Sequence, residues 1–171
     1  MTEDDGGGET VEDSDGFRAF QERVAGTNIS EQTLLATDYL NHFNEIVMLL
    51  EMIPDFQEGL DEAKEWAPRT YSEHFADSSF SDKDLAVEAY QHVPARYREP
   101  FERTIGQINQ LIALTISRLE TAIEVGDEHR LRLTAVDQCR DIQKLMDVAS
   151  AIIHGDDVTM SQTEIDHLLA D

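Results

Sequence analysis

Residues 101–125, FERTIGQINQLIALTISRLETAIEV, decide the fold class of this chain. Apolar residues recur there at spacings of three and four, the period of one face of an α-helix, and they are Phe101, Ile105, Ile108, Ile112, Ile116, Leu119 and Ile123. Gly126 follows at once, and glycine is a common helix stop. The pattern predicts one long helix that begins near Pro94 or Pro100 and ends at Gly126.

The sequence on either side of this stretch has the same helical period. A second long helix is predicted from about Asp127 to Ile153, ending before Gly155, with an apolar face of Leu131, Val136, Cys139, Ile142, Met146, Ala149 and Ile153. A third is predicted from Ser30, as N-cap, to Pro54, as stop, with an apolar face of Leu35, Leu40, Phe43, Val47 and Leu50. The predicted fold class is therefore all-α: a bundle of three long helices, with shorter helices between the first and the second.

The section between Pro54 and Pro100 has a different composition. It holds all four prolines, the only tryptophan and three of the four tyrosines. A short helix is expected to begin at Ser81, where Asp84 completes a capping box. We interpret the aromatic residues of this section as a satellite core at one end of the bundle, with a small-ligand pocket as the alternative; they are Trp66, Tyr71, Phe75, Phe80, Tyr90 and Tyr97.

The charge of the chain restricts its partners. It has 36 acidic and 13 basic residues among 171, a net charge of -23, and so acidic a surface repels nucleic acid and anionic lipid. Neither partner is expected. The longest apolar run, EIVMLLEMI, is interrupted by glutamates and is far shorter than a membrane span. A single cysteine, Cys139, predicts no internal disulfide and a small buried side chain. We expect a cytoplasmic protein without a cofactor.

The acidic residues are concentrated at the two ends. Residues 1–15 hold seven acids and no base, and residues 155–171 hold five acids and no lysine or arginine. The predicted organisation has four parts: a disordered acidic tail over 1–28, a helical bundle domain over 29–154, a linker over 155–160 and a partner-binding helical peptide over 161–170.

Two groups of polar residues could carry chemistry in the body of the protein. Asp38, His42 and Glu45 lie at i, i+4 and i+7 and form a polar stripe on a helix that is otherwise mostly apolar. A carboxylate beside a histidine suits a metal ligand or a general base, although a solvated helix face is the simpler interpretation. Glu88 and His92, at i and i+4, are a weaker candidate pair.

The last segment, VTMSQTEIDHLLAD, carries the start signals of a helix. Ser161 is a good N-cap, Glu164 closes a capping box, and Met160 can pack on Ile165. Ile165, Leu168 and Leu169 then fall on one face. So short a helix is not stable alone in water. It is expected to dock either in a groove of a partner or on its own bundle, and the pattern does not separate the two.

This segment closely resembles the response-regulator-binding peptide of the flagellar switch protein FliM. The shared pattern is Leu/Met-Ser-Gln-x-Glu-Ile-Asp-x-Leu-Leu, matched here by Met160, Ser161, Gln162, Glu164, Ile165, Asp166, Leu168 and Leu169. The resemblance implies that these residues bind a phosphorylated CheY-like receiver domain. The layout is also similar to that of the chemotaxis phosphatase CheZ, a helical body with a receiver-binding helix at its end.

CheZ has a catalytic pair, an Asp and a Gln four residues apart on a helix. The resemblance would imply an equivalent pair in this chain. No Asp-x-x-x-Gln occurs in this chain. The nearest candidates are Asp137, Asp141 and Gln138, and a second carboxylate would repel a phosphoryl group rather than orient water toward it. We therefore expect a non-enzymatic helical adaptor that binds a CheY-like receiver domain. The alternatives are a CheZ-like phosphatase, and an unrelated bundle that binds a metal or small ligand. A homodimer is possible.

Overall fold

The computed structural model describes residues 14–156 of the chain, and within them it is all-α. The described elements follow the order α1, η2 and α2 to α7, and the only strand-like pairing among them is an isolated bridge between Ile29 and Ala36. None of the described helices is both long and apolar enough to cross a membrane. The predicted fold class is thus confirmed at the level of helical content.

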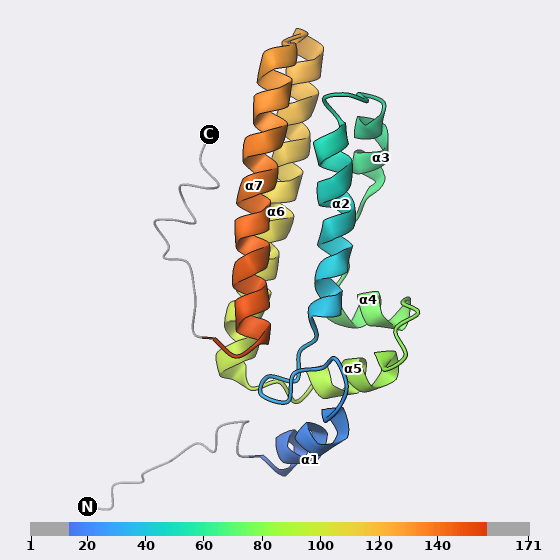
Figure 1. Ribbon diagram of the computed structural model, residues 1–171, viewed down its shortest axis with the longest axis vertical. Coiled ribbons are helices and arrows are strands. Elements are labelled where there is room, and N and C mark those ends of the chain that lie inside the picture. The colour runs from blue at the N-terminus through green and yellow to red at the C-terminus, as the bar shows by residue number, and fades with distance from the viewer. Residues whose placement is uncertain (1–13, 157–171) are drawn as a thin grey trace, which may run out of the picture.

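Two long helices form the spine of the molecule (Figure 1). Helix α6 is Ala95–Val125 and helix α7 is Glu128–Ile153, close to the predicted bounds, and they pack side by side along their length. Gly126 ends α6 with φ 78°, a conformation that glycine adopts without strain. The side chain of Asp127 then caps α7 by accepting a hydrogen bond from Arg130 N.

The third predicted long helix is shorter than expected. A 3₁₀ turn, η2 (Thr37–Leu40), leads into α2 (Asn41–Met52), which packs against α7, while α3 (Gly59–Glu65) contacts α2 and α6. The prediction that Ser30 caps this helix is wrong. The Ser30 Oγ accepts bonds from Gln32 N at 3.3 Å and Thr33 N at 3.4 Å, so it closes a local turn instead.

The loop over residues 29–36 has a structural role that the sequence did not indicate. The Thr33 Oγ1 is fully buried and donates a 2.6 Å bond to the carbonyl oxygen of Ile153. Gln32 Nε2 lies 3.5 Å from the carbonyl oxygen of Gly155. The last carbonyls of a helix have no partner within the helix. This loop therefore caps α7 and fixes the point where the chain leaves the body.

The remaining helices lie at the end of the molecule where α7 finishes: α1 (Asp15–Val24), α4 (Tyr71–Ala76) and α5 (Lys83–Tyr90) (Figure 1). The predicted disordered tail over 1–28 is wrong for residues 15–24, because they form α1 with Ser14 as its N-cap. The predicted capping box at Ser81 is also wrong, since α5 begins at Lys83 without a side-chain cap.

The candidate pair Glu88 and His92 serves to hold α1 on α5. Arg23 of α1 bonds Glu88 at 2.9 Å, and Phe20 of α1 stacks on the ring of His92 with centroids 4.6 Å apart. Together with the burial of Phe17 and Val24, these contacts place α1 against the body of the protein. They also leave the two side chains engaged with α1 rather than in an open site.

Candidate functional site

His42, the centre of the predicted polar stripe, is buried in an aromatic cluster. Its side chain is only 5% exposed, and its ring stacks on Trp66 with centroids 4.7 Å apart. The backbone N–H of Arg69 donates a 3.1 Å bond to Nε2, so this nitrogen is an unprotonated acceptor. His74 lies next to it, with ring centroids 6.0 Å apart. Burial, then the nearby His74 and Arg69, lower the pKa of His42 to about 4 from 6.5.

The stripe does not assemble a metal site. His42 faces inward, Glu45 is exposed and Asp38 is half-buried. Over residues 14–156, no three histidine, cysteine, aspartate or glutamate side chains come close enough together to hold a metal ion. The Nε2 lone pair of His42 is already used by Arg69 N. The cluster therefore acts as a structural joint between α2 and the 66–70 segment.

The aromatic section contributes to a continuous core with a cleft at its edge. Tyr71 and Phe75 are buried, and Tyr71 stacks on Tyr90 with centroids 4.7 Å apart. A cleft of about 310 Å³ opens beside Tyr90 and Phe101, within the size range of small-molecule sites. Asn109, which lines this cleft, has a side-chain oxygen without a hydrogen-bond partner in the described part of the chain. Glu102, which also lines the cleft, accepts a 2.6 Å bond from the Tyr90 hydroxyl.

The catalytic candidates on α7 point to two different faces. Asp137 is exposed and Asp141 is half-buried, whereas Gln138 is turned toward α6. There the Gln138 Oε1 accepts a 2.9 Å bond from Arg118 and a 3.3 Å bond from Thr115 Oγ1. An amide held in this way cannot also orient a water molecule beside Asp137 or Asp141. Asp137, Asp141 and Gln138 therefore form no pair arranged for phosphoryl hydrolysis.

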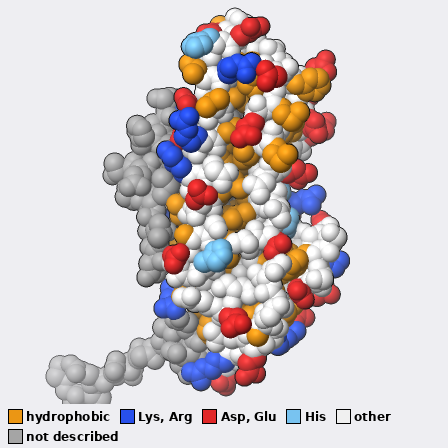
Figure 2. Space-filling view, viewed as in Figure 1, with side chains coloured by type: hydrophobic (Ala, Val, Ile, Leu, Met, Phe, Trp, Pro, Cys, Tyr) orange, Lys and Arg blue, Asp and Glu red, His pale blue; other side chains and the backbone are white. Residues whose placement is uncertain are grey.

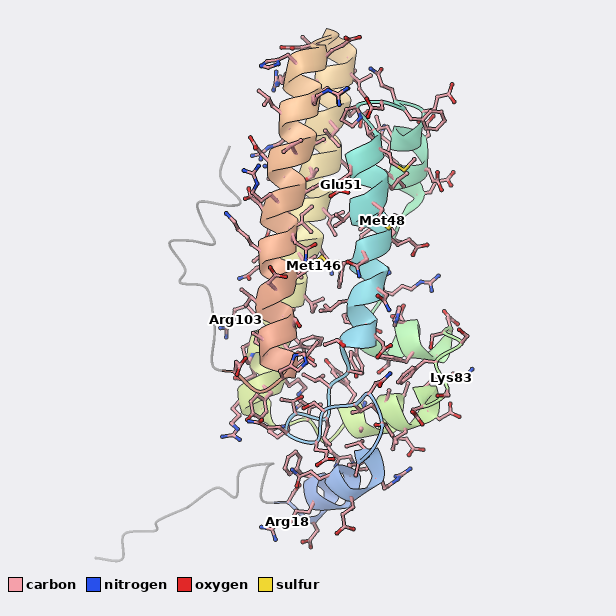
Figure 3. All side chains as sticks on the ribbon, viewed as in Figure 1. Arg18, Met48, Glu51, Lys83, Arg103 and Met146 are labelled. Carbon is pink, nitrogen blue, oxygen red and sulfur yellow. The ribbon has the colours of Figure 1, made fainter. Side chains whose placement is uncertain are left out.

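A groove between α2 and α7 was not predicted from the sequence. Its main hollow has a volume of about 480 Å³ and lies between the end of α2 and the face of α7, and its lining includes Glu51, Arg132, Val136, Cys139, Arg140 and Lys144. Figure 3 places Glu51 on the side of α2 toward α7. Three of the chain's 13 basic residues therefore gather in one hollow of a strongly acidic protein.

Large apolar side chains are exposed at and beside this groove. Val136, predicted to lie in the core, is 51% exposed on its wall. Met48 and Met52 of α2 are 64% and 55% exposed, around an adjoining hollow that shares Glu51. Figure 2 shows apolar side chains in a band between α7 and α2. Exposed apolar surface that is bordered by charges is typical of a docking site. The signal was present in the sequence: Arg132, Val136, Arg140 and Lys144 recur at spacings of four.

Cys139 forms part of the floor of the groove and is nearly buried, at 4% exposed. Burial, and then the charge of Glu51, raise the pKa of its thiol to about 12. A thiol that stays protonated is a poor nucleophile. This confirms the interpretation of Cys139 as a small buried side chain.

The predicted partner-binding residues, from Met160 to Leu169, lie outside the described part of the chain. Comparisons of this protein with protein-family models, with curated proteins and with solved structures find no match. Its function therefore has to be argued from its own residues.

Proposed function

We propose that this protein is a non-enzymatic helical adaptor whose 161–170 peptide binds a CheY-like receiver domain in chemotaxis or flagellar signalling. One observation carries the proposal. Eight positions of the FliM receiver-binding pattern are matched in order, from Met160 to Leu169, within a single run of ten residues. His167 stands at a variable position that is usually small in FliM peptides, and it does not share the helical face of Ile165, Leu168 and Leu169.

The chemistry of the peptide supports this mode of recognition. An amphipathic helix binds a groove through apolar anchors at i, i+3 and i+4, the spacing of Ile165, Leu168 and Leu169. Glu164 and Asp166 add negative charge, which accelerates association with a basic rim. The peptide has no lysine or arginine of its own. A receiver surface with apolar pockets and surrounding lysines or arginines is the partner that fits.

The body of the protein favours an adaptor over a phosphatase. Gln138, the amide beside Asp137 in the sequence, is held at the α6–α7 interface by Arg118 and Thr115. The other amide of α7 in this region, Gln143, donates a 3.2 Å bond to Asp147. Asp137 and Asp141 lie near Arg140 at 3.7 Å and Lys144 at 3.9 Å. We therefore assign recognition to the peptide and presentation to the helical body, without a catalytic step and without a cofactor.

The decisive experiment measures binding of the full chain to a CheY-like receiver, with and without a phosphoryl mimic such as beryllofluoride. Replacing both Ile165 and Leu169 by alanine should weaken binding at least tenfold, because each side chain contributes about 1.5–3 kcal/mol when it is fully buried. Thr163→Ala, off the apolar face, is the matched control and should change affinity by less than about twofold. Equal affinities for all three chains, or no binding to any activated receiver, would refute the proposal.

A further inference from the structure

The groove between α2 and α7 begins where the tail of the chain leaves the body. A hollow of about 290 Å³ is lined by residues from the start of α2 and the end of α7, among them Asn41, Asn44 and Ser150. It shares Gln143 and Asp147 with the main hollow of about 480 Å³. The two hollows thus form one groove along the α2–α7 seam. Ser150, which lines the smaller hollow, lies five residues before Gly155, whose carbonyl oxygen is contacted by Gln32.

The polarity of the groove changes along its length in the same order as the polarity of the tail sequence. The hollow near the tail is polar, with the two asparagines and Ser150. The main hollow is lined by the apolar residues Ala135, Val136 and Cys139, by three cations and by two acids. The cations are Arg132, Arg140 and Lys144, and the acids are Glu51 and Asp147. In the tail, the polar residues 155–157 precede the apolar and acidic residues 160–169.

The charges of the two parts are complementary. Residues 157–171 hold four acids and no lysine or arginine. On the groove, the ion pairs of Arg140 and Lys144 within residues 14–156 are with Asp137 at 3.7 Å and Asp141 at 3.9 Å, on their own helix, and the two cationic side chains are 62% and 57% exposed. The carboxylates of Glu51 and Asp147 line the same hollow. Such exposed pairs are worth little, so these cations remain able to pair with an incoming carboxylate.

The distances fit as well. Lys144 lies nine residues before Ile153, a distance of about 14 Å along α7 at 1.5 Å per residue. The five steps from Asp156 to Ser161 span up to about 17 Å when extended. A helix over residues 161–170 is about 15 Å long. Running antiparallel to α7, it would cover the helix from about Lys144 to residue 134, which includes Arg140 and Val136.

From this geometry we infer that the chain's own 157–171 segment docks in the α2–α7 groove, with Ile165 and Leu169 over the apolar floor and Glu164 and Asp166 near Arg140 and Lys144. The groove then holds the peptide in the absence of a receiver, and a receiver has to displace it. That this docking regulates receiver binding rests on the proposed function. The docking itself is independent of any receiver.

The test is amide hydrogen exchange of the full chain without a partner, in four versions. The wild type should protect residues 161–170 at least tenfold over the rates of an unstructured peptide. Arg140→Glu with Lys144→Glu should abolish this protection. Arg103→Glu with Lys83→Glu makes the same change in charge outside the lining of the groove (Figure 3) and should preserve it. Ile165→Ala with Leu169→Ala, in the tail itself, should abolish it without affecting the body, and the exchange of α6 and α7 checks folding.

Each other result overturns the inference. An unprotected tail in the wild type means that it does not dock on the body, and protection that survives in both charge variants means that it docks elsewhere. Loss of protection in both charge variants would mean that only the overall charge matters. The receiver titration then separates the two proposals: the groove variant should bind an activated receiver several-fold more tightly than the wild type. If the tail docks but no receiver binds, only the proposed function fails.

Discussion

The buried histidine of α2 makes the stability of the fold sensitive to mild acid. The pKa of His42 is about 4 in the folded chain, against 6.5 for an unperturbed histidine. Because the folded pKa is lower, the unfolded chain binds the proton more readily, so stability is complete above pH 6.5 and is lost as the pH falls toward 4. Between pH 7.5 and pH 5 the linkage relation gives a loss of about 2 kcal/mol from this one residue.

The assay is urea unfolding, followed by far-ultraviolet circular dichroism, at several pH values between 7.5 and 5. The perturbation is His42→Gln, whose amide oxygen can still accept the N–H of Arg69 but does not titrate. The variant should be less stable than the wild type at pH 7.5, because it loses the stacking on Trp66. Its stability should then fall less steeply, so that the difference between the two chains narrows by about 2 kcal/mol at pH 5.

The contributions of other titrating groups to the pH dependence of stability cancel in this comparison, provided that His42→Gln does not change their surroundings. His74 is the histidine next to His42, and burial lowers its pKa as well. A second variant, His74→Gln, measures its share separately. Parallel pH profiles for the wild type and His42→Gln would refute the reasoning, since they would mean that His42 has the same pKa in the folded and the unfolded chain.

Three further predictions concern the cap of α7, the charge of the chain and the candidate catalytic residues. Thr33→Val should lower the free energy of unfolding by about 1–3 kcal/mol, because it leaves the buried Ile153 carbonyl without its 2.6 Å partner. Thr33→Ser keeps the hydroxyl and should lower it by less. Equal losses for the two variants in urea titrations would contradict the capping role. Raising sodium chloride from 0.05 to 1 M should raise the melting temperature, since screening weakens the self-repulsion of a chain with net charge -23, and a fall would mean that its exposed ion pairs matter more than the repulsion. Adding the protein should leave the lifetime of a phosphorylated receiver unchanged or lengthen it; faster dephosphorylation that Asp137→Ala or Asp141→Ala abolishes would establish the phosphatase alternative instead.

The helices that the sequence predicted best are those whose boundaries depend on local chemistry. The apolar period from Phe101 to Ile123 and the stop at Gly126 are sufficient to place most of α6, because Gly126 adopts the left-handed conformation, with φ 78°, that ends a helix. The start of α2 depends on tertiary contacts instead. Ser30 has the residue type of an N-cap, but the loop that contains it is drawn to the end of α7 by Thr33. A contact across 120 residues leaves no local signal.

In the candidate sites, too, the sequence predicted what depends on local pattern and missed what depends on tertiary contacts. Periodicity correctly placed Cys139 on the inner face of α7, yet it assigned Val136 to the core, where the structure leaves it half exposed on the groove. The apolar face of α7 is wider than α6 and α2 together can cover, so one edge of it remains open. Likewise, Asp38, His42 and Glu45 share a helical stripe, but the 66–70 segment covers only His42. Which positions of a helix become buried depends on distant segments that pack against it. The periodicity of the helix's own sequence carries no information about those segments.

Competition between the groove and a receiver has a consequence for affinity that can be worked out. A segment joined to its site by a short linker experiences an effective concentration on the order of millimolar. If the peptide bound the groove with a dissociation constant of about 0.1 mM, roughly one chain in ten would have it free. The full chain would then bind a receiver about tenfold more weakly than the isolated 157–171 peptide does, because the apparent affinity falls with the fraction of competent chains. Substitutions in Arg140 and Lys144 would shift this equilibrium without changing the peptide that binds the receiver.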